Sequence, residues 1–212
     1  MKCFDPDCRQ CPRLANYLKT VRRNYPDYHA RPVAPFGDKQ PRLLIVGLAP
    51  GLHGANATGR PFTGDHAGIL LYETLYRYGF SNKPVATGQK DGLKLTGCRI
   101  TNAVKCVPPA NKPLGDEIAT CNHYLEAELK GLISVRIILA LGRIAHNAVL
   151  KACTLKQTAF PFVHGKVHKL GNGCRLVDSY HCSRYNTQTG RLTVEMFHAV
   201  FSKIHELLKL TD

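Results

Sequence analysis

Short apolar runs alternate with amphipathic segments along the whole chain. Four of the runs are rich in aliphatic residues and lack the alternation of a half-exposed strand, which is typical of strands buried on both faces of a parallel sheet. These predicted strands cover residues 43–46, 99–104, 137–141 and 176–179. Between and after them, apolar residues at helical spacing predict helices over residues 67–78, 116–129, 144–150 and 194–208.

This alternation of strand and helix predicts an α/β fold, a three-layer α/β/α sandwich with a central, mostly parallel four-stranded sheet. The chain has no internal repeat or long linker, although residues 28–40 are Pro-rich and are predicted to be irregular. We therefore expect a single domain spanning residues 1–212. Ligands of such sheets bind outside the carboxyl ends of the strands, so the segments after Val46, Thr101 and Ser179 should converge on one cleft.

The composition narrows the choice of partner and compartment. With 29 Lys and Arg against 15 Asp and Glu, the formal net charge of +14 favours a polyanion such as nucleic acid, although a merely basic protein has the same charge. No apolar run approaches the roughly 20 residues that cross a bilayer, and the N-terminus is too polar for a secretory signal. We expect a cytoplasmic monomer with no membrane partner. Nine cysteines, an odd number, then favour metal or cluster ligation over disulfides.

The first predicted strand leads directly into a turn of small residues, Gly47, Leu48, Ala49, Pro50 and Gly51. Small residues let the backbone approach a ligand closely and turn its amides outward. The turn is therefore interpreted as a cradle for a base or a phosphate, with a purely structural turn as the alternative.

Four segments together carry a specific resemblance. They are GLAPG at residues 47–51, HGANATGRPFTGD at residues 53–65, ITNAVKC at residues 100–106 and SYHCSRYNTQTGRLT at residues 179–193. These motifs, spread over nearly the whole chain, resemble the uracil-DNA glycosylase superfamily, and most closely its family 5, the type b enzymes. The resemblance implies a monofunctional hydrolase that cleaves the N-glycosidic bond of uracil in double- or single-stranded DNA and leaves an abasic site.

An extruded base must be held by stacking and by hydrogen bonds to its polar edge. In the motifs, Phe62 offers an aromatic face, worth about 1 to 3 kcal/mol, and Asn102 offers one donor and one acceptor. The alternatives are an ordinary core aromatic and a satisfied buried amide. Together with the backbone of Gly47, Leu48, Ala49 and Gly51, they form the predicted base-binding set.

Cleavage places negative charge on the departing base and positive charge on the sugar. His181, just after the fourth predicted strand, is the candidate donor to the base oxygen, unless it is a surface or capping histidine. Related families have a polar or acidic residue where this chain has Leu48, so another group must handle the attacking water. Asp65 is the candidate, with a helix N-cap as the closely matched alternative.

The loop after His181 is expected to contact DNA. Arg184, Tyr185 and Arg191 suit phosphate and groove contacts, although Tyr185 could instead pack beneath the loop. Two further basic residues, Arg60 and Lys105, are weaker candidates for the same footprint. The family usually has Pro then Ser after the histidine, whereas this chain has Cys182 and Ser183, which predicts a looser loop.

Four of the cysteines, Cys8, Cys11, Cys106 and Cys121, fall where families 4 and 5 place cluster ligands. Four thiolates suit zinc equally, and their spacing alone leaves the two open. The resemblance implies a 4Fe-4S cluster with a structural role, which ties the N-terminal segment to the domain.

Two other functions remain open from these residues. The same site could act mainly on deaminated purines, hypoxanthine and xanthine, because an apolar Leu48 suits relaxed specificity. A DNA-binding iron-sulfur redox sensor without glycosylase activity is the alternative from a different class. A sensor would not need the motif around Phe62 and Asp65.

Overall fold

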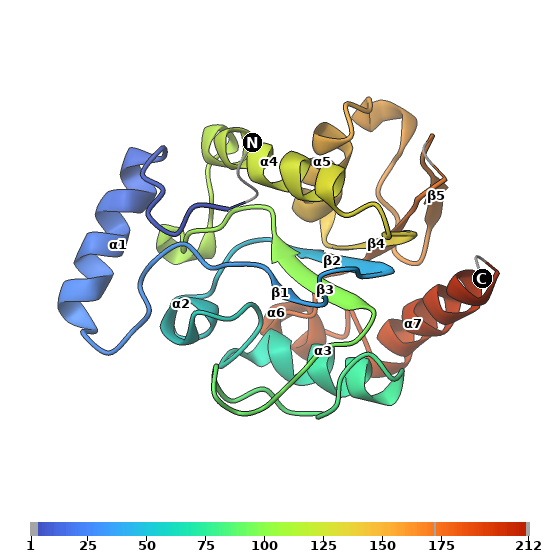
Figure 1. The fold of residues 1–212 in the computed structure, drawn as a ribbon, viewed down its shortest axis with the longest axis horizontal. Helices are drawn as coiled ribbons and strands as arrows, with labels where there is room; N and C mark the ends of the chain where they lie inside the picture. The colour runs from blue at the N-terminus through green and yellow to red at the C-terminus, as the bar shows by residue number, and fades with distance from the viewer. Residues whose placement is uncertain (1–3, 172, 211–212) are drawn as a thin grey trace.

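A mixed six-stranded sheet forms the middle layer of the computed structural model, which describes residues 4–171 and 173–210 (Figure 1). The order is β1–β3–β2–β4–β6–β5. The four central strands pair in parallel and are β3 (Cys98–Asn102), β2 (Leu43–Gly47), β4 (Ile137–Leu141) and β6 (Arg175–Ser179). Two edge strands pair antiparallel with β3 and β6 and are β1 (Phe36–Gly37) and β5 (Val167–Lys169).

The predicted parallel centre of the sheet is confirmed, but the predicted strand number of four is wrong. The two extra strands have two and three residues, too few to show any apolar pattern, and they exist because a longer neighbour offers them hydrogen bonds. The second predicted strand also ends earlier than expected, at Asn102. Beyond it, the amides of Ala103 and Val104 still donate to the carbonyls of Gly47 and Leu48.

All four predicted helices are present, with ends that differ by no more than two residues. They are α3 (His66–Arg77), α4 (Gly115–Gly131), α5 (Arg143–Ala152) and α7 (Val194–Lys209). Five further elements were not predicted and are α1 (Pro12–Asn24), α2 (Ala55–Thr58), α6 (Arg184–Gln188) and the 3₁₀ turns η1 (Pro109–Asn111) and η2 (Gln157–Ala159).

The two-residue period of β2 divides its apolar side chains between two cores. Leu43 and Ile45 pack into the core that contains α3 and α7, whereas Leu44 and Val46 pack into the core that contains α4 and α5. In Figure 1 the first pair of helices lies below the sheet and the second pair above it. All four side chains are fully buried, which explains why the strand lacks apolar–polar alternation.

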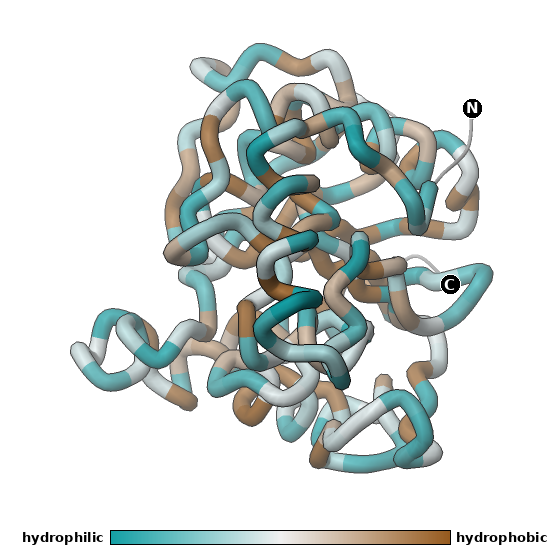
Figure 2. The backbone as a smooth tube through the Cα atoms, turned by 90° about the vertical axis from the view of Figure 1, so that its left-hand side faces the viewer, coloured by the Kyte–Doolittle hydropathy of each residue, from teal (hydrophilic) through white to brown (hydrophobic). Residues whose placement is uncertain are grey.

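A third, smaller core joins the N-terminal segment to the domain. Helix α1 starts at Pro12, a residue suited to the first helical position, and buries Leu14, Leu18 and Val21 on one face. Cys106, after β3, and Cys121, on α4, belong to this core, and Cys8 and Cys11 pack against it from the N-terminal segment. In Figure 2 the outer turns are mainly hydrophilic and apolar segments cross the middle. Among the described residues, no helix has both the length and the apolar character to span a bilayer.

Candidate functional site

A cavity of about 490 Å³ opens at the carboxyl ends of the parallel strands. The turn after β2, Asn102 at the end of β3, Gly142 after β4 and His181 after β6 all line it. The expected convergence of the strand ends is therefore confirmed. Of the predicted base-binding and catalytic residues, those that line the cavity are Leu48, Ala49, Gly51, Phe62, Asp65, Asn102 and His181.

Gly47 does not line the cavity but lies directly behind two of the residues that do. A Cβ atom at this position would lie 2.4 Å from Oδ1 of Asn102 and 2.6 Å from Cζ of Phe62. The expected direct contact of Gly47 with a base is thus replaced by an indirect role. The missing side chain provides the space in which the amide and the aromatic ring meet.

Phe62 and Asn102 form the wall that suits a flat ring with a polar edge. Phe62 is 6 % exposed and belongs to the main core as well as to the cavity, and its backbone has φ +54°. Asn102 is 3 % exposed, and its Oδ1 has no hydrogen-bond partner. A buried amide oxygen without a partner is costly unless a ligand donates to it.

His181 stands beside Phe62, with ring centroids 5.8 Å apart and an angle of 26° between the planes. Its Nδ1 is buried without a partner. Burial lowers the pKa of His181 to about 4, so the imidazole is neutral near pH 7 and keeps one N–H donor.

Asp65 is both a helix N-cap and a residue that lines the cavity. It is the N-cap of α3, and its Oδ1 accepts a hydrogen bond of 3.0 Å from the amide of Gly68. Its Oδ2 lies on the side of Gly51, 3.6 Å from where a Cβ on that glycine would be, and the residue lines the cavity. Burial raises the pKa of Asp65. The helix cap therefore orients a carboxylate whose second oxygen lies toward the cavity wall.

Comparison with known proteins places this cavity in a family. Residues 34–205 match the model of the uracil DNA glycosylase superfamily. The chain belongs to the uracil-DNA glycosylase superfamily. It is 48 % identical over 208 residues to the Type-5 uracil-DNA glycosylase of Thermus thermophilus, covering 96 % of this chain and 94 % of the relative. A Type-5 enzyme of Pyrobaculum aerophilum is 43 % identical over 201 residues, covering 93 % and 87 %.

A Type-4 uracil-DNA glycosylase of Archaeoglobus fulgidus is more distant, at 30 % identity over 206 residues, covering 94 % of this chain and 87 % of the relative. The residues matched by the family model include the central sheet and the residues that line the cavity.

Side-chain hydrogen bonds hold the segment after His181 in this member of the superfamily. Ser183 caps α6 by accepting from the amide of Asn186, and Nδ2 of Asn186 donates to the carbonyl of His181 at 2.8 Å. Cys182 is fully buried in the main core, so the thiol faces away from solvent. These contacts restrain the loop that was predicted to be loose.

The three predicted DNA-contacting residues lie on or near this loop. Arg184 is exposed and lines the cavity mouth. Tyr185 is 70 % exposed, so the alternative of packing beneath the loop is wrong. Arg191 is exposed, and its guanidinium lies 4.8 Å from the ring centre of Tyr180.

The two weaker candidates for DNA contact, Arg60 and Lys105, are corrected by the structure. Arg60 is 3 % exposed and donates to both carboxylate oxygens of Asp91. Lys105 is 1 % exposed, and its Nζ donates to Thr101 and lies 3.6 Å from a carboxylate oxygen of Glu128. Both cations are buried inside the domain with acidic partners, away from any phosphate of a bound DNA.

Several cavity residues were missed in the sequence. Gly142, Arg143 and Ile144 follow β4, and the rule that ligands meet the carboxyl ends of parallel strands would have found them. Asn111 lines the cavity from η1 with φ +56°, and His66 lines it from the first turn of α3. For these two the sequence holds no signal beyond their nearness to the motifs.

The four predicted ligand cysteines lie together in the third core. Cys8, Cys11, Cys106 and Cys121 line a small cavity of about 20 Å³. Burial, with the nearby Cys121 as the next cause, raises the pKa of the Cys11 thiol to about 11, and burial also raises the pKa of Cys106. Mutual repulsion of thiolates is expected where several sulfur atoms share one buried site without a cation.

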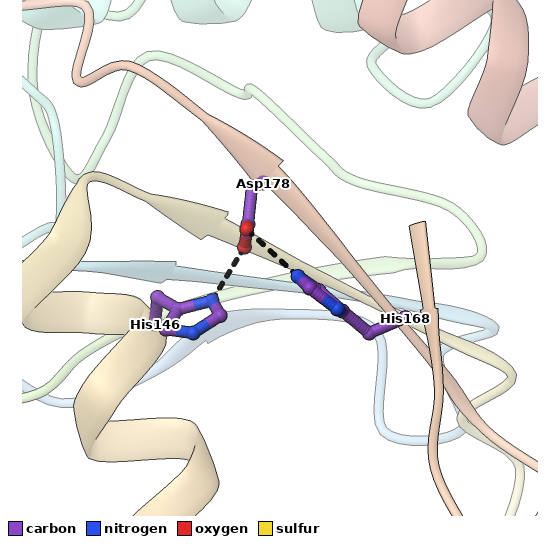
Figure 3. A group of neighbouring side chains, drawn as sticks. All are labelled: His146, His168 and Asp178. Atoms are coloured by element: carbon purple, nitrogen blue, oxygen red, sulfur yellow. Dashed lines mark hydrogen bonds and ion pairs between the residues drawn. The ribbon is translucent and has the colours of Figure 1, made fainter. Parts of the chain in front are cut away.

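A second group with metal-ligating atoms lies outside the cavity, where Asp178 contacts His146 and His168 (Figure 3). Nδ1 of His146 lies 2.6 Å from one Asp178 oxygen, and Nε2 of His168 lies 3.1 Å from the other. Nε2 of His146 lies 2.8 Å from the carbonyl of Phe160. A carbonyl only accepts, so Nε2 of His146 is the donor in this bond. These bonds fasten α5, β5 and β6 together.

Gly47→Ala should destabilise the protein. The added methyl group would meet Asn102 and Phe62 in a packed site, and overpacking of this kind costs about 1 to 3 kcal/mol in free energy of unfolding. Urea denaturation measures the change. Gly88→Ala is the control, since a Cβ there meets nothing within 4 Å, and it should stay within about 0.5 kcal/mol of the parent. Equal stability of the two variants would show that Gly47 provides no necessary space.

Proposed function

We propose that the protein removes uracil from DNA by hydrolysing the N-glycosidic bond, leaving an abasic site. One observation carries the proposal. In a member of the uracil-DNA glycosylase superfamily, a single cavity is lined by an aromatic face, an unpartnered buried amide, a neutral imidazole and a carboxylate. Relatives named Type-5 uracil-DNA glycosylase, 43 to 48 % identical, support the same activity.

Binding begins with extrusion of the nucleotide, which costs a few kcal/mol and is offset inside the cavity. The base stacks on Phe62, and the unpartnered Oδ1 of Asn102 accepts from a ring N–H of the base. The Asn102 amide nitrogen is free to donate to a base carbonyl. The Asn102 oxygen, which has no partner in the protein, and the Asn102 amide nitrogen would then both form hydrogen bonds with the base.

Bond cleavage is assisted by charge stabilisation on both fragments. The neutral His181 donates its N–H to the base oxygen on which negative charge grows, in a buried site where such a bond is strong. Asp65 holds the attacking water, accepts its proton and offsets the positive charge of the sugar. No lysine is among the described residues that line the cavity, which supports hydrolysis without a Schiff base.

A wider substrate range is the second candidate. The cavity volume of about 490 Å³ and its apolar lining by Leu48 leave room for a purine ring. We infer that hypoxanthine and xanthine are secondary substrates of the same site. Release of uracil alone from duplexes carrying each lesion would contradict this wider range.

DNA is the expected partner of the basic surface. Arg184 lines the cavity, and Tyr185 and Arg191 are exposed on the segment that follows His181. All three suit phosphate and minor-groove contacts. We propose that the protein acts as a monomer on double- or single-stranded DNA. The redox-sensor alternative has no support, because it leaves the cavity without a purpose.

We propose further that the four cysteines hold a 4Fe-4S cluster. Among the described residues, one group has three metal-ligating atoms of His, Cys, Asp or Glu within 4.8 Å of one another, and it consists of His146, His168 and Asp178. No three of the four cysteine sulfurs are therefore that close together. Tetrahedral zinc with Zn–S bonds of about 2.3 Å needs sulfurs about 3.8 Å apart, whereas a cluster holds them wider. The amide of Lys105 donates to Sγ of Cys121 at 3.3 Å, as is common around cluster sulfurs.

The cluster would stabilise the fold rather than take part in the reaction. Ala49 packs partly against the same core and also lines the cavity. Cross-linking α1, α4 and the segment after β3 would therefore support one side of the base-binding turn.

His181→Ala should lower the rate of uracil release by about 10²- to 10³-fold, because one donor to the developing anion is lost. Binding of DNA should change little, since the residue acts on the transition state. Single-turnover kinetics and fluorescence anisotropy measure the two effects. If both fell together, His181 would be holding structure rather than stabilising the anion.

The pH dependence should report Asp65. Burial raises the pKa of Asp65, and the ionised form is the active one, so the rate should fall on the acidic side at a higher pH than the usual carboxyl value of about 3.9. His181 protonates only near pH 4 and should add no step above about pH 5. Asp65→Asn should remove the acidic fall and slow the reaction by about 10²- to 10⁴-fold. An acidic fall that survives in this variant would assign it to another group.

Cys106→Ala should lower visible absorbance and thermal stability together, because one ligand of the proposed cluster is lost. Iron analysis and thermal unfolding measure the two changes. Cys153→Ala is the control, since this half-buried thiol lies outside the third core and should keep both properties. Colourless parent protein that retains zinc would refute the cluster.

A further inference from the structure

A groove of about 600 Å³ adjoins the base cavity. The two share a wall made of Phe62, Asp65, His66 and Arg184. Its volume lies within the range of about 300 to 1,000 Å³ that is usual for ligand sites. A ligand in the cavity that continues along its own backbone therefore has a second hollow directly beside it.

The far walls of the groove are apolar and exposed. Ile69 on α3 is 65 % exposed and Val85 in the loop after α3 is 62 % exposed, with Pro84 and Ala86 beside it. Apolar side chains of this size suit the flat face of a nucleobase. Because the groove continues from a cavity that takes a base, the next nucleotide of the same strand is its expected occupant.

Glu73 gives the groove a polar edge. It lies one helical turn after Ile69, is exposed, and makes no hydrogen bond or ion pair with any described residue. Arg184 lies on the wall shared with the cavity, whereas Glu73 lies among the groove residues that the cavity does not share. The carboxylate would repel a phosphate on its own side of the groove, which points to a base rather than the backbone as the group held there.

A carboxylate only accepts hydrogen bonds. Cytosine, adenine and guanine carry an exocyclic amino group that can donate to it. The one N–H donor of thymine, at N3, lies between two carbonyl oxygens, which would repel the approaching carboxylate. Glu73 can therefore favour the amino-bearing bases over thymine by one hydrogen bond.

We propose that this groove binds the base next to the lesion on the same strand and that Glu73 selects a base with an amino group over thymine. The proposal rests on the proposed excision of uracil and adds a sequence context to it. It makes Glu73 a specificity-determining residue outside the reacting atoms.

The test uses single-stranded oligonucleotides with one uracil, in which the 5′ and the 3′ neighbour are varied separately. At one of these two positions, kcat/KM for uracil release should be about threefold to tenfold lower with thymine than with cytosine, adenine or guanine, as for the loss of one hydrogen bond. In Glu73→Gln the difference should vanish, because an amide can both donate to thymine and accept from an amino group.

A second variant tests the groove without touching Glu73. Val85→Asp places a charge among the apolar walls and should raise KM with kcat retained. Tyr76→Asp is its control, since Tyr76 is 51 % exposed on α3, the helix of Ile69 and Glu73, but does not line the groove. Unchanged KM in Val85→Asp would overturn the proposal and would leave the groove to an apolar partner other than DNA.

The outcomes separate the two proposals. Uracil release with equal efficiency in all contexts, or a context preference that persists in Glu73→Gln, would overturn the groove proposal and leave the excision of uracil intact. Failure to release uracil from every oligonucleotide would overturn the proposed function itself.

Discussion

Close packing where β2 ends holds the candidate site together. Gly47 is the register partner of Asn102 in the parallel pair of β2 and β3, and the ring of Phe62 enters the space that a side chain at position 47 would occupy. Phe62 accepts a left-handed backbone with φ +54°, a conformation that costs a non-glycine residue of the order of 1 to 3 kcal/mol. The surrounding core must hold this strain, and it does so by burying Phe62 with α3 and α7.

Burial acts in opposite directions on the two groups assigned to the chemistry. It lowers the pKa of His181 and raises the pKa of Asp65, which favours the neutral form of each. A neutral imidazole remains a donor across the physiological range, while the amide of Gly68 keeps the carboxylate hydrogen-bonded at the start of α3. The same low dielectric strengthens the contacts of both groups with charge that develops in the transition state.

Apolar patterning predicted the strands and helices that have an extensive apolar surface of their own to bury. The central strands and the helices α3, α4, α5 and α7 follow from it, because each needs a partner layer to cover its apolar face. Helix α1 was missed although Leu14, Leu18 and Val21 have helical spacing after Pro12. Positive charge was a poor guide to which residues lie where DNA could bind. Arg60 and Lys105 are basic, but they form buried ion pairs with acidic residues distant in the sequence.

The sequence by itself determined the fold class, the meeting of strand ends at one cavity and the residues of its central wall, such as Phe62, Asn102 and His181, since strand periodicity and motif order are local properties. Only the tertiary structure decided the edge strands, the indirect role of Gly47, the combined cap and cavity position of Asp65, and the groove beside Glu73. These depend on pairing, desolvation and close approach between segments distant in the chain. Such distances and burial are set when the layers pack, and no local pattern records them.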